Sequence, residues 1–258
     1  MNEIFTLSVI LAMFVGLSAG YIGSLIVLKR MALVGDALSH VALPGLALGI
    51  LFNFNPFLGA FAFLFASAIL TWYVERVVRL PVESVVGVLF VTALALGILM
   101  IPQENLLEAL FGDIAKITTF GAVLAIVASV VVIYVMKVTY SKLVLATISE
   151  ELAVSRGVNV AKVNLVYLLL VSIVVAIGVS VVGTLLVGAL VVIPAVAAKI
   201  ISSNLSKYAL LSSIFGLISA SVGVILASYT GLPAGPMAIF SGLTIFIACL
   251  VAKSTIVK

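Results

Sequence analysis

The stretch VNLVYLLLVSIVVAIGVSVVGTLLVGALVVIPAVAA, residues 163–198, carries no charged side chain over 36 positions. A single helix of that length would measure about 54 Å, which is far longer than a bilayer hydrocarbon core of about 30 Å. The IGVSVVG sequence at 177–183 contains two glycines and offers a turn. We therefore predict two membrane-spanning helices here, near 164–181 and 183–199.

The remainder of the chain has the same character. Of its 258 residues, 65% are hydrophobic and 9% are charged, whereas an average soluble domain has roughly 25% charged residues. Apolar runs long enough to span a bilayer recur near 4–28, 31–52, 56–74, 84–101, 119–136, 208–228 and 237–252. The sequence thus predicts an all-α, polytopic membrane helical bundle of about nine spans, forming a single transmembrane domain over residues 1–258.

The basic residues indicate how these spans are oriented. If the N-terminus lies outside, twelve of the 13 lysines and arginines fall on the inner side and only Lys116 lies outside. The inner ones are Lys29, Arg30, Arg76, Arg79, Lys137, Lys142, Arg156, Lys162, Lys199, Lys207, Lys253 and Lys258. This bias is typical of a cytoplasmic face, so the net charge of +4 does not require a nucleic-acid partner. We expect a multi-pass protein with its C-terminus in the cytoplasm.

Two polar segments interrupt the apolar pattern. The longer one, residues 137–164, lies inside in this topology, and the other, residues 102–116, lies outside. In the inner segment, apolar residues alternate with charges, and Gly157 interrupts a short helix-like stretch. We interpret the inner segment as an amphipathic element that docks on a partner protein or on the membrane surface; the alternative is a plain solvated loop.

The second apolar run begins with MALVGDALSHVALPG, residues 31–45, which contains the only histidine of the chain. Asp36 and His40 are four positions apart in the sequence, so a helix places both side chains on one face. His40 follows Arg30 by ten residues, or about 15 Å of helix, which puts it near the middle of the bilayer. Ionisable groups at that depth are costly against lipid and are expected to face the bundle interior or a wet pathway.

A carboxylate and a neutral imidazole together form half of a site for a divalent cation such as Zn²⁺, Mn²⁺ or Fe²⁺. Pro44 strengthens this reading, because a proline cannot donate to the His40 carbonyl four residues earlier, and broken helices coordinate ions in transporters. Spacing alone leaves two alternatives open: a structural Asp–His pair at a buried interface and a proton relay.

The sequence RMALVGDALSHVALPGLALG at 30–49 resembles the signature of the zinc/manganese class of ATP-binding-cassette importer permeases, the ABC-3 type. Four further stretches resemble motifs of that family in the same order. They are LFGDI at 110–114, SEELAVSRGV at 149–158, VGALVVIPAVAA at 187–198 and LPAGP at 232–236. The matches extend over most of the chain, and their order makes the resemblance specific.

The resemblance implies a fold like that of type II ATP-binding-cassette importer permeases and a place in a prokaryotic plasma (inner) membrane. It implies a permease homodimer, two ATP-binding-cassette ATPase subunits and an extracytoplasmic metal-binding protein as partners. It assigns the intramembrane metal site to Asp36 and His40. It also assigns coupling to the ATPase to five residues of the inner segment: Glu150, Glu151, Leu152, Ala153 and Gly157. Ser149 departs from the family, which often has aspartate there.

Taken together, these features predict a permease subunit for ATP-driven import of zinc, manganese or iron by alternating access, with the metal as cargo and no tightly bound cofactor. Glu104, Glu108 and Asp113 give the outer segment an acidic character that could attract cations; alternatively they only solvate a loop or cap a short helix. The sequence contains no G-x-x-x-x-G-K-[ST] motif, so ATP hydrolysis is expected from a separate subunit.

Three rival functions use the same residues differently. An ion-coupled secondary metal transporter would need no ATPase, but it would be expected to carry more ionisable groups within its spans. A permease for a metal chelate would need a wider polar or aromatic path. An intramembrane enzyme would need more than one histidine and has no HExxH motif to build on.

Overall fold

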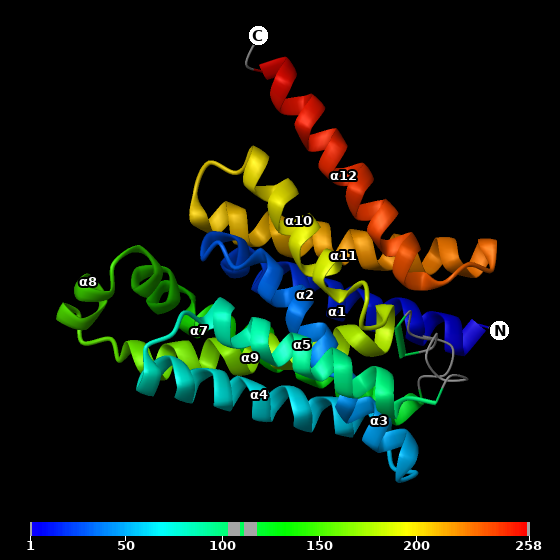
Figure 1. Cartoon of the computed structure of the whole chain (residues 1–258). Coiled ribbons are helices and arrows are strands. Elements are labelled where there is room, and N and C mark those ends of the chain that lie inside the picture. Colours follow the sequence, from blue (N-terminus) through cyan, green and yellow to red (C-terminus); the bar gives the residue numbers. More distant parts are fainter. Residues whose placement is uncertain (1, 103–108, 111–117, 257–258) are drawn as a thin grey trace.

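The computed structural model of the chain describes residues 2–102, 109–110 and 118–256, and the regular structure within these ranges is helical (Figure 1). The first five helices are α1 (Asn2–Leu28), α2 (Ala32–Val41), α3 (Leu43–Leu51), α4 (Pro56–Val78) and α5 (Val82–Met100). They are followed by α7 (Thr119–Ile148), α8 (Glu150–Ser155), α9 (Val160–Val182), α10 (Val187–Ile201), α11 (Leu205–Thr230) and α12 (Ala234–Ile256).

Eight segments of the described chain are long and apolar enough to cross a membrane, and α2 and α3 together count as one of them, Ala32–Leu51. The predicted span at 183–199 corresponds to α10, an apolar helix of 15 residues that is shorter than the others. The all-helical, multi-span prediction is therefore confirmed, and the count of nine is approximate.

The break between the sixth and seventh predicted spans is real but lies later than predicted. Helix α9 continues through the IGVSVVG sequence to Val182, and the turn occupies residues 183–186. Gly183 ends the helix with a φ of +81°, a conformation that is open to glycine but costly for other residues. Gly178 lies within helix α9, and its lack of a side chain lets Val187 pack closely against it.

The predicted inner polar segment is largely an extension of a membrane helix. Residues 137–148 continue α7 without interruption, so only the eleven residues 149–159 between α7 and α9 lie outside these two long helices. Leu143 is fully buried on this extension, whereas Lys137 and Lys142 are exposed. Helix α7 ends at Ile148, and Ser149 is its C-terminal cap residue.

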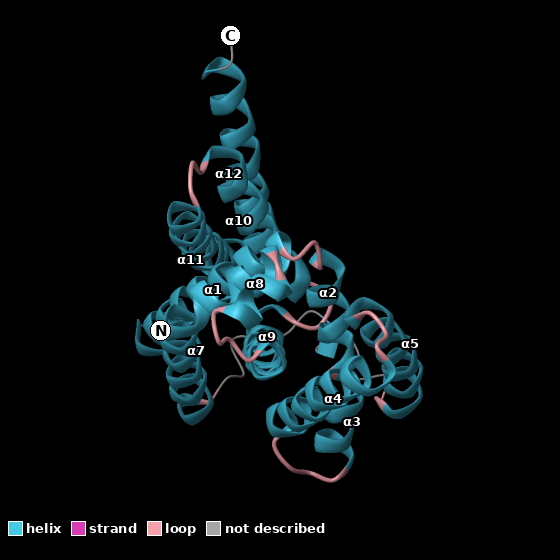
Figure 2. Cartoon of the chain, turned by 90° about the vertical axis from the view of Figure 1, so that its left-hand side faces the viewer, coloured by secondary structure: helices cyan, strands magenta, loops and turns pink. Residues whose placement is uncertain are grey.

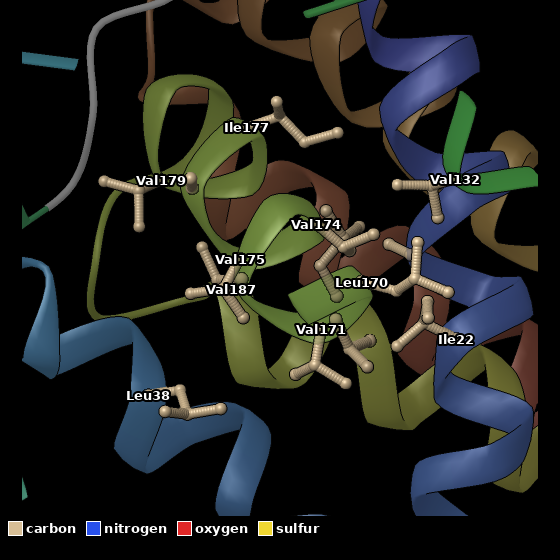
Figure 3. Packing of buried hydrophobic residues seen from close by; sticks show 14 of the residues in the cluster. Ile22, Leu38, Val132, Leu170, Val171, Val174, Val175, Ile177, Val179 and Val187 are labelled. Atoms are coloured by element: carbon tan, nitrogen blue, oxygen red, sulfur yellow. The ribbon is translucent and has the colours of Figure 1, made fainter. Parts of the chain in front are cut away.

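Helix α1 lies at the centre of the bundle and packs against α11, α7, α10 and α9. Its contact with α11 is close enough that a Cβ on Gly16 would collide with the Gly216 backbone, as in small-residue crossings of membrane helices. Helix α9 contributes a dense row of buried valines, and Figure 3 shows Val175 next to Val187 at the start of α10, with Leu38 of α2 nearby.

Two ends of the bundle can be distinguished. Helix α8 projects at one end, beyond the α1–α2 and α4–α5 turns, and the N-terminus lies at the other end (Figure 1). Helix α12 packs against α11 and α10 and extends away from the rest of the bundle (Figures 1 and 2). Cys249 on α12 is a free, buried thiol.

Candidate metal site and coupling segment

The segment that carries Asp36 and His40 is a broken helix. Helix α2 ends at Val41, α3 begins at Leu43, and Pro44 occupies the first turn of α3, where its missing N–H costs nothing. The sequence predicts that Pro44 leaves the His40 carbonyl without a donor. In the structure, a backbone N–H at the C-terminal cap of α2 donates to this carbonyl. The His40 carbonyl is therefore already paired, and the side chains of Asp36 and His40 are the main candidate metal ligands of this segment.

His40 is buried, with 8% of its surface exposed. Its Nδ1 atom has no hydrogen-bond partner among the described residues. The ring lies against Phe90 of α5, with a centroid separation of 5.3 Å. Because buried polar atoms are usually paired, an imidazole nitrogen left without a partner is available to a ligand that binds nitrogen, such as a transition metal.

Asp36 lies one helical turn before His40 and is half-buried, so the two side chains share a face with their Cβ atoms about 6 Å apart. Among the described residues, none donates a hydrogen bond to the Asp36 carboxylate. Gly188 of α10 packs directly on it: a Cβ added there would lie 2.6 Å from the Asp36 Cβ and 2.8 Å from Oδ1. The site therefore lies where α2, α5 and α10 meet.

Asp36 and His40 do not by themselves make a complete coordination shell. In the part of the chain that the structure describes, no three histidine, cysteine, aspartate or glutamate side chains are grouped so that they could hold a metal ion. The predicted outer-loop residues Glu104, Glu108 and Asp113 lie outside the described residues. Water and backbone oxygens are the remaining donors for the other positions around a cation.

The α9–α10 turn contacts the segment of α2 that carries the candidate site. The Ser39 hydroxyl lies 2.5 Å from the Thr184 carbonyl oxygen and 2.6 Å from the Asp36 carbonyl oxygen. Thr184 in turn donates to the Ala109 carbonyl through both its backbone N–H, at 3.2 Å, and its hydroxyl, at 3.0 Å. Ser39 and Thr184 are both fully buried.

At the other end of the bundle, the predicted coupling residues form a short capped helix. The Ser149 hydroxyl accepts a hydrogen bond from the Leu152 N–H at the start of α8. At its end, Val158 N–H donates to the Ala153 carbonyl and Gly157 N–H donates to the Val154 carbonyl, which is a Schellman motif. Gly157 has a φ of +76°, as this motif requires at that position.

Helix α8 is anchored by one residue and exposes the rest. Ala153 is fully buried, whereas Leu152 is 44% exposed and Val154 is 59% exposed. Glu150 and Glu151 are also exposed. The helix thus presents two carboxylates and a small apolar surface beyond the end of the bundle, where Figure 2 shows it facing the viewer.

A partly buried basic residue lies at the α1–α2 turn. Lys29, just after α1, donates a hydrogen bond of 3.1 Å to the Asn164 side-chain oxygen of α9 and lies 4.6 Å from the centre of the Tyr167 ring. Burial lowers the pKa of Lys29, and the nearby carboxylates of Glu75 and Glu83 act in the opposite direction. Glu75 also interacts electrostatically with Glu150 of α8.

Sequence reasoning identified Asp36 and His40 but not the residues that contact them. Phe90, Thr184 and Gly188 look like ordinary members of apolar runs. Of these three residues, only Gly188 lies within a stretch that the sequence singled out, VGALVVIPAVAA at 187–198.

The whole chain is similar to known transport proteins. A sequence model described as the ABC 3 transport family matches residues 1–253. The manganese transport system membrane protein MntC of Listeria innocua is 31% identical over 250 residues, which cover 95% of this chain and 89% of that protein. The high-affinity zinc uptake system membrane protein ZnuB of Buchnera aphidicola is 27% identical and covers 88% of this chain and 90% of its own length.

Among solved structures, PsaBC from Streptococcus pneumoniae in complex with Fab superimposes with a TM-score of 0.84 at 26% identity, covering 96% of this chain and 91% of that one. An inward-facing conformation of a putative metal-chelate type ABC transporter has a TM-score of 0.76 at 19% identity, covering 97% and 89%, which supports the fold alone.

Proposed function

This chain belongs to the ABC 3 transport family, and we propose that it is the permease subunit of an ATP-driven importer of divalent transition-metal ions, manganese or zinc above all, with iron as a further candidate cargo. Its curated relatives are membrane proteins of manganese and zinc transport systems. ATP hydrolysis belongs to a separate subunit, because the sequence lacks a phosphate-binding G-x-x-x-x-G-K-[ST] loop.

The observation that carries this proposal is the unpaired Nδ1 of buried His40 one helical turn from the Asp36 carboxylate. A neutral imidazole and a carboxylate suit a borderline divalent cation. An Asp–His pair that served only to hold two helices together would be expected to satisfy both groups with hydrogen bonds. Phe90 packs against the His40 ring and Gly188 packs against Asp36, and such close packing favours a bare ion over a bulky chelate.

In the proposed import cycle, metal enters near one end of the bundle and the ATPase subunits bind at the other end. Metal delivered by an extracytoplasmic binding protein would reach Asp36 and His40 from the side of the α9–α10 turn. ATPase subunits would bind α8 through Leu152, Val154 and the carboxylates of Glu150 and Glu151. Closure of the ATPase pair would then switch the site from outward to inward access, with the N-terminus outside and the C-terminus in the cytoplasm. Two copies of the permease would form the working unit.

The driving force distinguishes this proposal from an ion-coupled secondary metal transporter. The experiment is uptake of Mn²⁺ or Zn²⁺ into proteoliposomes that contain the permease with its ATPase, energised either by ATP or by an imposed proton gradient. We expect uptake with ATP only. Uptake by the permease alone, driven by the gradient, would overturn the assignment.

A further inference from the structure

We propose that Ser39 and Thr184 are positioning residues for the metal site, so that the α9–α10 turn at 183–186 links the outer segment of the chain to Asp36 and His40. This inference rests on the proposed function, because it concerns how the same site is set.

The first step is the place of Ser39. It lies between Asp36 and His40 on α2, and its hydroxyl is in contact with two carbonyl oxygens, one on Asp36 and one on Thr184. A hydroxyl has a single proton to donate, so this proton is shared between α2 and the α9–α10 turn. The helix turn that carries both metal-binding candidates is thus tied to an element about 145 residues later in the chain.

The second step is that the α9–α10 turn is also hydrogen-bonded to a segment other than α2. Thr184 donates two hydrogen bonds to the Ala109 carbonyl, and Leu185 N–H donates to the Leu110 carbonyl at 3.0 Å. Ala109 and Leu110 belong to the polar segment that the sequence places outside the membrane. A displacement of Ala109 would therefore be transmitted through Thr184 to Ser39 by direct hydrogen bonds.

The third step is that α10 carries the same displacement to the carboxylate. The turn leads into α10 at Val187, and Gly188 follows with its backbone against Asp36. Irregular backbone at membrane depth is normally found where it lines a functional cavity. The turn therefore controls Asp36 from two directions, through the Ser39 hydroxyl and through the α10 backbone.

The test measures the affinity of the purified, full-length permease for Mn²⁺ by competition with a metal chelator, together with ATP-driven uptake by the reconstituted complex. Ser39→Ala and Thr184→Val each remove one hydroxyl. Since a buried hydrogen bond contributes roughly 1 kcal/mol, we expect affinity to fall about fivefold to tenfold in each variant and uptake to fall with it. Thr184→Ser keeps the hydroxyl and should retain wild-type affinity.

Ser129→Ala is the matched control, because the Ser129 hydroxyl is fully buried and donates only within its own helix, to the Ala125 carbonyl. Wild-type affinity in folded Ser39→Ala and Thr184→Val would overturn the positioning role, as would an equal loss in Ser129→Ala. Asp36→Ala tests the site itself: if it binds Mn²⁺ normally, the proposed metal site fails, whatever the other variants do. If Asp36→Ala loses binding while Thr184→Val does not, only the positioning role fails.

Discussion

Gly188 of α10 and Asp36 of α2 are in direct contact, and a Cβ at position 188 would lie 2.6 Å from the Cβ of Asp36. No ordinary van der Waals contact is that short, so any larger residue at 188 must move α10, α2 or the carboxylate. The relationship joins a glycine from a late helix to the aspartate that the sequence singled out.

Gly188→Ala tests this contact. Overpacking of a tight interface typically costs about 1–3 kcal/mol, and the displaced carboxylate should lower metal affinity and ATP-driven uptake by at least about tenfold. Gly87→Ala on α5 is the control, because a Cβ there meets no atom within 4 Å. Equal uptake by the two alanine variants would show that the Asp36 contact has no role in transport.

Gly157→Ala addresses the capped end of α8. The added Cβ meets no neighbour within 4 Å, but the residue has a φ of +76°, which costs a non-glycine residue of order 1 kcal/mol or more. We expect weaker association with the ATPase subunit and lower coupling of ATP hydrolysis to uptake. Gly157→Asn should be milder, because asparagine tolerates the left-handed conformation. Unchanged coupling in Gly157→Ala would remove the assignment of α8 as the coupling helix.

Ser149→Ala removes the N-terminal cap of the same helix. Loss of such a cap costs about 0.5–2 kcal/mol, so α8 should fray and bind the ATPase less tightly in a pull-down of the two subunits. Ser149→Asp restores a capping oxygen and should bind like wild type. If alanine and aspartate behave alike, the hydrogen bond from Leu152 N–H to Ser149 does not matter for docking.

Lys29 gives the protein a pH-dependent stability. Its pKa in the folded protein is lowered below the ordinary value of 10.5, chiefly by burial. Between the lowered pKa and 10.5, the unfolded chain holds more protons than the folded one, so stability rises with pH in this window. Relative to Lys29→Met, the thermal midpoint of the wild type in detergent should rise as pH increases toward 10.5. A difference that shrinks with pH would contradict the burial of a charged Lys29.

Local patterns predicted much of this molecule. The apolar runs located the helices because a membrane span needs a fixed length of apolar sequence, and the spacing of Asp36 and His40 needed only the helical period. The turn at 183–186 was predicted a few residues too early, because Gly178 also looks like a breaker. In the structure Gly178 is helical and serves as a close-packing position for Val187, a tertiary contact that a local pattern does not contain.

The contacts around the site could not be predicted from sequence. Phe90 and Thr184 meet α2 only because helices far apart in the chain pack together, and neither carries a charge that would mark it in an apolar run. The inner segment 137–164 was predicted as a separate polar element for a related reason. Its alternating polar residues lie on the exposed side of a continued α7, whose other side buries Leu143.

The most direct measurement of the central claim is ATP-driven uptake of Mn²⁺ and Zn²⁺ by the reconstituted complex with wild-type permease, Asp36→Ala or His40→Ala. Ser129→Ala, whose hydroxyl donates within its own helix, serves as the control for an altered buried polar residue. We predict that the Asp36 and His40 variants assemble with the ATPase but lose metal uptake, while Ser129→Ala transports normally. Wild-type uptake by either site variant would contradict the metal-site assignment and leave the Asp–His pair with a structural role.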